Sequence, residues 1–90
     1  MEKITKIIND WDPIGFFPMA PEDEYENEIK DICEYIHSNQ NLQIETLAEA
    51  INKIFVEAFG LDVYDENLEQ CALVAGKIML QYCKGYEENA

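Results

Sequence analysis

The chain has 90 residues, of which 48% are hydrophobic and 11% aromatic, and its formal net charge at pH 7 is −13. This length suffices for one domain with a modest core, and the hydrophobic fraction excludes a disordered chain. Its 19 carboxylates against 6 lysines and no arginine exclude a nucleic-acid-binding protein, because cationic side chains are needed to neutralise phosphates.

The first predicted element is an amphipathic helix over about residues 2–10. Its apolar residues recur at helical spacing and form one stripe: Ile4, Ile7, Ile8 and Trp11. Pro13 ends this helix, because proline disfavours the α conformation of the residue before it. The segment that follows contains Gly15, Pro18 and Pro21 and is predicted to be an irregular connector.

The second helix is predicted over about residues 22–37, and the third over about residues 43–59. Three carboxylates begin the second helix, at the positive end of its dipole: Glu22, Asp23 and Glu24. Gly60 follows the third helix and suits the left-handed conformation that often ends helices.

The fourth helix is predicted to begin after Asp65, a good N-cap, and to run to about Tyr82, with a frayed tail from about residue 85. Its apolar face is unusually wide, because three apolar residues lie off the main stripe: Leu73, Val74 and Leu80. Gly76 in its interior indicates a close approach between helices.

No run has the two-residue period of a strand, so the predicted fold is all-α. We expect a single compact four-helix domain over residues 1–90, with an apolar loop between helices one and two. The spacing of Cys33, Cys71 and Cys83 indicates reduced, apolar side chains rather than a disulfide. Neither a membrane span nor a secretory signal is recognisable, so we expect a cytoplasmic protein without membrane contact.

The connector between the first two helices is the most distinctive part of the sequence. Residues 11–21 read W-D-P-I-G-F-F-P-M-A-P, an apolar run in an acidic chain. Loops normally expose polar residues, so this one must either fold onto the core or offer an apolar surface to a partner. Asp12 before Pro13 is predicted to accept backbone N–H groups in an Asx-type turn, and Gly15 allows the positive φ that such a turn needs.

Four aromatic residues accompany this turn. Trp11 closes the apolar stripe of the first helix and is predicted to anchor the connector to the core. Tyr25 combines an apolar ring with a hydroxyl that needs a partner when buried. Phe16 and Phe17 are adjacent, and adjacent side chains of extended backbone point opposite ways. We expect the connector to cap the bundle, with one of the two phenylalanines left to face solvent or a partner.

The pattern W-D-P-I-G at residues 11–15, with D-E-Y at residues 23–25 opening a helix, resembles domain-of-unknown-function family 1871, a group of small firmicute proteins. The pattern continues with a Glu-Ile pair and a Gly-Leu pair: Glu28, Ile29, Gly60 and Leu61. The resemblance spans most of the chain and implies an all-α fold without an established activity. The connector is longer and more aromatic than the family pattern at residues 16–19.

No catalytic residue, metal site or cofactor is predicted. Glu34 and His37 form a Glu-x-x-His pair, which di-iron bundles use in two copies, but this is the only histidine. The single serine, Ser38, is next to that histidine in sequence, which does not make a catalytic dyad. We therefore do not expect an enzyme.

The leading hypothesis is a non-enzymatic interaction protein that docks a basic partner, as an immunity protein or an inhibitor does. Acidic residues near the second helix, Asp23 and Glu24, would steer the encounter. Tyr25 and one of Phe16 or Phe17 would anchor the complex.

Two alternatives accompany this hypothesis. A homodimer would bury the additional apolar residues of the fourth helix, and the protein would then be a structural or regulatory adaptor. A small-molecule or metal binder would use the region around Glu34 and His37.

Overall fold

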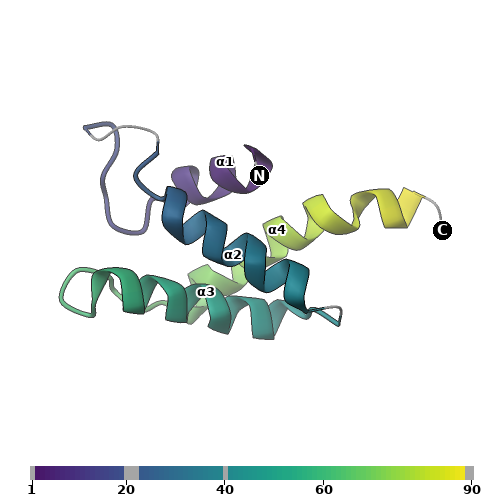
Figure 1. Cartoon of the computed structure of the whole chain (residues 1–90). Helices are drawn as coiled ribbons and strands as arrows, with labels where there is room; N and C mark the ends of the chain where they lie inside the picture. The colour runs from purple at the N-terminus through teal and green to yellow at the C-terminus, as the bar shows by residue number, and fades with distance from the viewer. Residues whose placement is uncertain (1, 20–22, 40, 89–90) are drawn as a thin grey trace.

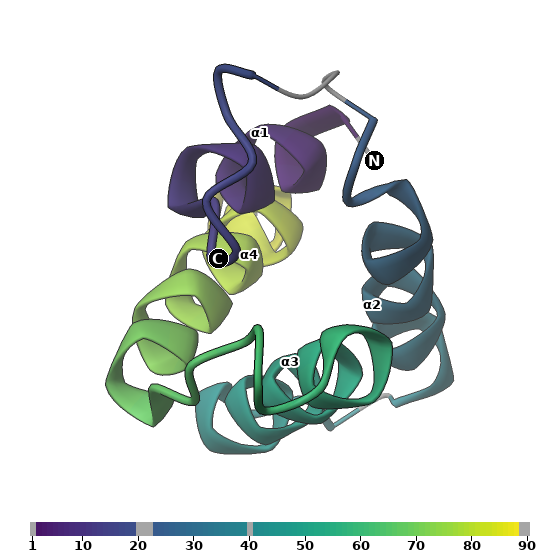
Figure 2. The ribbon, with the colours of Figure 1, turned by 90° about the vertical axis from the view of Figure 1, so that its left-hand side faces the viewer.

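The computed structural model describes residues 2–19, 23–39 and 41–88. These residues form four α-helices and no strand: α1 (Glu2–Trp11), α2 (Glu26–Ser38), α3 (Ile44–Phe59) and α4 (Leu68–Glu88). Each helix packs against two neighbours, in the cyclic order α1, α2, α3 and α4 (Figure 1, Figure 2). The predicted all-α four-helix domain and its irregular connector are confirmed.

The apolar stripes of the four helices supply one core. Its largest fully buried side chains come from every helix and from two aromatic residues outside them: Tyr25, Tyr64, Phe55, Ile4, Ile8, Ile29, Ile32, Leu47, Ile51, Ile78 and Cys71. Burial of each isoleucine or leucine contributes about 1.5–3 kcal/mol before the cost of conformational entropy. Within the described part of the chain, none of the helices combines the length and the apolarity needed to cross a membrane.

The start of α2 differs from the prediction. The helix begins at Glu26, and residues 23–25 form a turn in which the Glu26 N–H donates to the Asp23 carbonyl. Asp23 and Glu24 therefore precede the helix, and the acidic residues of its first turn are Glu26 and Glu28. The physical reason lies at Tyr25, whose side chain turns into the core and whose backbone leaves the helical conformation. Pro21 and Glu22, which the prediction placed at the helix start, lie outside the described residues.

The ends of α3 agree with the prediction to within one residue. At the start, the Thr46 hydroxyl accepts the Gln43 N–H, which would otherwise have no partner in the helix. At the end, Gly60 has a φ of 78° and donates its N–H to the Val56 carbonyl. Gly60 therefore occupies the left-handed position that the sequence predicted.

Both ends of α4 lie elsewhere than predicted. Asn67 rather than Asp65 caps the helix, since its side-chain oxygen accepts the Gln70 N–H at 3.1 Å. The helix passes the predicted end at Tyr82 and continues to Glu88, so that it projects beyond the other helices (Figure 1). Side chains from Tyr82 onward, including that of Cys83, lie outside the described residues. Cys33 and Cys71 are buried free thiols.

The interpretation of Gly76 was wrong for the isolated chain. A Cβ added to Gly76 would meet no atom within 4 Å beyond the backbone of its own helix, so no helix in the described part of the chain requires glycine there. Val74 belongs to the buried stripe, whereas Leu73 and Leu80 are exposed. The wide apolar face of α4 therefore consists of a buried stripe and a separate exposed pair.

Gly76→Ala is expected to raise the free energy of unfolding by about 0.5–1 kcal/mol, because alanine lowers the entropy lost on helix formation. Urea denaturation at low protein concentration measures the change. Gly60→Ala is the matched control and is expected to destabilise the chain, because the backbone at Gly60 has a positive φ. Loss of stability in Gly76→Ala would contradict the open surroundings of this residue.

Candidate functional site

Asp12 organises the connector that the sequence singled out. It follows α1 with a φ of 46° and donates its N–H to the Ile8 carbonyl, so it ends the helix. Its carboxylate accepts the N–H groups of Phe16 and Phe17 at 2.8 and 3.1 Å. Gly15, with a φ of 82°, donates to the Asp12 carbonyl. The predicted acceptance of backbone N–H groups by Asp12 and the positive φ at Gly15 are confirmed. The turn is not an Asx turn, because the N–H groups that Asp12 accepts lie four and five residues later, and that of Ile14 binds the Tyr25 hydroxyl.

Tyr25 ties this turn to the start of α2. Its hydroxyl donates to Asp12 Oδ1 at 2.6 Å and accepts the Ile14 N–H at 3.1 Å. Burial favours a raised pKa for Asp12, but the hydrogen bonds from Tyr25, Phe16 and Phe17 outweigh it and lower the pKa. Burial and the Asp12 hydrogen bond both raise the pKa of Tyr25. Asp12 is therefore stabilised as a carboxylate and Tyr25 as a neutral phenol, as expected for a hydrogen bond that holds the turn in place.

The connector folds onto the core through its aromatic residues. Seven rings form one connected cluster: Trp11, Phe16, Phe17, Tyr25, Phe55, Phe59 and Tyr64. The ring centroids of Trp11 and Phe55 lie 5.2 Å apart, and those of Phe16 and Tyr25 lie 5.3 Å apart. Trp11 therefore links the connector to α3, as predicted.

The predicted role of this connector as a partner anchor needs correction at Tyr25. Tyr25 is 0% exposed, so its side chain has no surface to offer a partner. Phe16 and Phe17 are both partly buried and packed against the core, and neither stands free in solvent. Pro13 is partly buried next to the turn. Among the large hydrophobic residues of the described connector, the exposed one is instead Met19, at 92%.

The predicted acidic steering residues, Asp23 and Glu24, are exposed in the turn before α2. Glu28, in the first turn of the helix, is largely buried. Burial raises the pKa of its carboxyl, and the nearby charge of Asp31 raises it further. The charged form of Glu28 is therefore disfavoured, mainly by burial.

A second polar cluster joins α3 to α4. The Tyr64 hydroxyl lies 2.9 Å from Asn52 Oδ1, to which it donates, and 3.2 Å from Cys71 Sγ. Asn52 Nδ2 in turn donates to Glu66 at 2.8 Å. Burial raises the pKa of the Cys71 thiol, so the thiolate is disfavoured. This environment suits a structural cysteine and not a reactive one.

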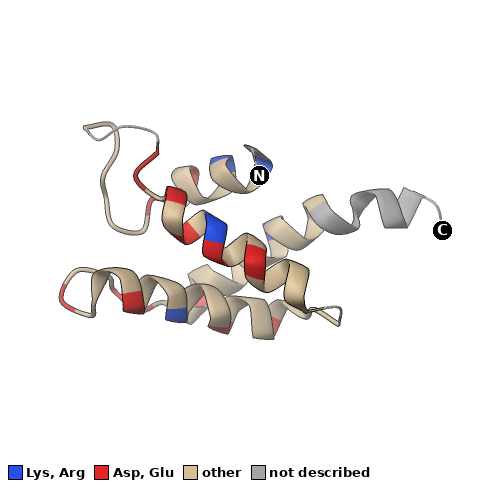
Figure 3. Ribbon diagram, in the orientation of Figure 1, with Lys and Arg blue, Asp and Glu red and all other residues tan. Residues whose placement is uncertain are grey.

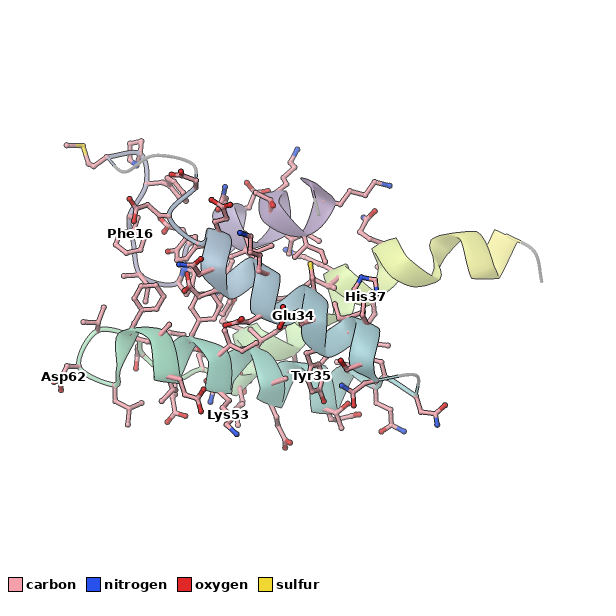
Figure 4. All side chains as sticks on the ribbon, in the orientation of Figure 1. Phe16, Glu34, Tyr35, His37, Lys53 and Asp62 are labelled. Atoms are coloured by element: carbon pink, nitrogen blue, oxygen red, sulfur yellow. The ribbon has the colours of Figure 1, made fainter. Side chains whose placement is uncertain are left out.

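A groove of about 630 Å³ runs between α2 and α3. Residues of both helices line it: Asp31, Glu34, Tyr35, Ser38, Asn39, Thr46, Glu49, Ala50, Lys53, Ile54 and Glu57. Four of these are carboxylates and one is a lysine. Figure 3 shows acidic positions in red along the ribbons of α2 and α3, and Figure 4 labels the side chains of Glu34, Tyr35 and Lys53 on these helices. The groove therefore has a negative rim above an aromatic and aliphatic floor.

The groove was not predicted as a site. Its carboxylates flank the apolar stripes of two helices, and from sequence such positions look like ordinary solvent-facing residues. Only the packing of α2 on α3 brings Asp31 and Glu34 near Glu49 and Glu57. Glu34 was considered with His37 for metal binding. Among the described residues, no group of three or more His, Cys, Asp or Glu side chains is placed to hold a metal.

Comparison with known families agrees with the connector pattern. The family described as Domain of unknown function (DUF1871) matches residues 3–84. The chain belongs to this family. No curated protein and no solved structure is detectably similar to it. In this DUF1871 chain, the ring of Tyr25 is part of the core and the turn at Asp12 lies partly buried against it.

Proposed function

We propose that this DUF1871 protein is a non-enzymatic interaction protein that docks a basic partner. The observation that carries the proposal is the groove between α2 and α3, whose rim has the carboxylates of Asp31, Glu34, Glu49 and Glu57 against the single ammonium of Lys53. The role would be immunity-like or inhibitor-like, with a small acidic domain covering a cationic surface.

The floor of the groove supports this proposal. Tyr35 and Ile54 are partly buried there and give apolar area on which the stems of lysine or arginine side chains can pack. The rim then places carboxylates around the cationic ends. Asp23 and Glu24, exposed before α2, extend the negative field, which speeds the encounter with a positively charged partner.

The proposed docking site is the groove between α2 and α3, and not the connector. Phe16, Phe17 and Tyr25 pack in the aromatic cluster, and none of them lines the groove. The groove includes Glu34 and so also covers the region of the small-molecule alternative. The metal alternative has no group of three or more ligating side chains among the described residues.

A lysine-rich helical peptide is the probe that tests this function, with a glutamate-rich peptide of equal length as the control ligand. We expect the lysine-rich peptide to bind at about 20 mM salt and to dissociate at about 500 mM salt, because screening weakens charge pairs. Fluorescence anisotropy of the labelled peptide measures both affinities. No binding at low salt would contradict the proposal.

Two double variants locate the binding site. Glu34→Gln/Glu49→Gln removes two charges from the groove, and Asp62→Asn/Asp65→Asn removes two exposed charges from the loop after α3. We expect the groove variant to weaken binding on the order of tenfold, and the loop variant to change it about twofold. Equal losses would show that the net charge, and not the groove, holds the peptide.

A further inference from the structure

The groove between α2 and α3 has an uneven distribution of charge along its α3 side. Glu49, Lys53 and Glu57 are exposed groove residues that follow one another at four-residue spacing, which places them in one row on the helix. Each step of this row is about 6 Å along the helix axis. Figure 3 shows one blue position along α3, with red positions on either side of it. The α3 rim of the groove is therefore negative at both ends and positive between them.

The ammonium of Lys53 forms no ion pair with any residue in the described part of the chain. Glu49 and Glu57 lie one turn before and one turn after it, at a spacing that often forms ion pairs in helices. The ion pair found in the structure is instead that of Lys30 with Glu26 on α2, at 3.4 Å. A ligand in the groove can therefore contact the Lys53 ammonium and the two carboxylates beside it separately.

A helix is the kind of ligand that can match this row. Side chains recur on one face of a helix every three to four residues, so a helix lying along α3 repeats at the spacing of Glu49, Lys53 and Glu57. An extended segment is usually held by hydrogen bonds to a sheet edge, and the described residues form no strand that could provide one. Tyr35 and Ile54, partly buried on the floor of the groove, can receive the apolar residues of an amphipathic helix.

We propose that the groove binds one amphipathic helix in which a cationic, an acidic and a second cationic residue follow one another at four-residue spacing, and that Lys53 selects the acidic residue. The two cations lie opposite Glu49 and Glu57, and the acid lies opposite Lys53. A cation at the central position faces Lys53 instead, and like charges that face each other oppose binding. Asp31 and Glu34 on the α2 rim still require a partner with a net positive charge. This inference rests on the proposed function and specifies the partner of the same groove.

Two helical peptides of identical composition and net charge test this pattern. In the first peptide, lysine, glutamate and lysine follow one another at four-residue spacing, and in the second the glutamate exchanges places with one of these lysines. We expect the first peptide to bind on the order of fivefold more tightly at about 20 mM salt, because two of the three facing charge pairs become repulsive in the second. Fluorescence anisotropy of the labelled peptides measures both affinities. The first pattern reads the same in both directions, so the result does not depend on the direction in which the helix lies.

Lys53→Glu is expected to make the two affinities equal within about twofold, because each peptide then forms two attractive pairs and one repulsive pair with the row. Lys30→Glu is the matched control, since it makes the same change of charge at an exposed residue of α2 that does not line the groove. It is expected to keep the preference for the first peptide. Circular dichroism checks that both variants retain the helical content of the wild type.

The outcomes separate this inference from the proposed function. Equal binding of the two peptides to the wild type would overturn the inference and leave the proposed function standing. A preference that persists in folded Lys53→Glu, or that Lys30→Glu removes equally, would also overturn it, since Lys53 would then not be the residue that selects. Absence of binding by both peptides at low salt would overturn both proposals.

Discussion

Phe55→Ala is expected to lower the free energy of unfolding by about 3–5 kcal/mol. Phe55 is fully buried, and its ring contacts those of Trp11, Tyr25, Phe59 and Tyr64. Truncation leaves a cavity at the point where the connector, α1 and α3 meet. Small domains have a total stability of about 5–15 kcal/mol, so this variant should be close to unfolding at room temperature.

Urea denaturation followed by far-ultraviolet circular dichroism measures this loss. Leu61→Ala is the control, because Leu61 is also a large apolar residue but is 63% exposed, and its change should stay within about 0.5 kcal/mol. If Phe55→Ala cost no more than this control, the seven-ring cluster would not be the centre of the fold.

Asp12→Ala is expected to lower the free energy of unfolding by about 3 kcal/mol. The carboxylate accepts hydrogen bonds from Phe16, Phe17 and Tyr25, and its loss leaves the two backbone donors without their carboxylate acceptor and the Tyr25 hydroxyl without Asp12. Alanine is also less tolerant than aspartate of the φ of 46° at this position. Asp12→Asn keeps one side-chain oxygen and the backbone preference, so it should cost less than Asp12→Ala.

The pH dependence of stability tests the charge of Asp12 separately. Its pKa is lowered in the folded chain, so its ionisation stabilises the fold above the ordinary aspartate pKa of about 4. This contribution is lost as the pH falls through the folded pKa. The stability difference between wild type and Asp12→Asn is therefore expected to shrink below about pH 4. If the stability difference between wild type and Asp12→Asn grew at acid pH, the ionised carboxylate of Asp12 would not be what stabilises the turn.

The local features of the connector could be predicted from sequence because they depend on neighbouring residues. The turn at Asp12, the positive φ of Gly15 and the left-handed Gly60 each follow from the stereochemistry of a few positions. The helical stripes were also predictable, since their spacing does not depend on which surface they meet.

The features that depend on packing could not be predicted in the same way. α2 begins at Glu26, later than predicted, because the Tyr25 hydroxyl is hydrogen-bonded to Asp12, thirteen residues earlier in the chain. Whether Phe16 packs inward depends on the ring of Phe59 in α3. The groove is formed only when α2 docks on α3, and its carboxylates look like solvent-facing residues in either helix alone.

The burial of Val74, in contrast to the exposure of Leu73 and Leu80, also depends on packing and could not be predicted from sequence. All three lie beside the main apolar stripe of α4 in sequence, and only the rotation of the helix against α1 and α3 decides that Val74 is buried. The exposed pair is thus a property of the assembled bundle, although the composition of α4 indicated that some apolar residues were in excess.

The connector also sets where the length of this protein can change. Its first part, from Asp12 to Phe17, is partly buried and held to the core, because the turn and both phenylalanines contact Tyr25. Met19, two residues later, is almost fully exposed. The boundary between interior and loop therefore lies within the connector and not at the end of α1. In this chain, an insertion is therefore expected to be tolerated at Met19 and not between Asp12 and Phe17.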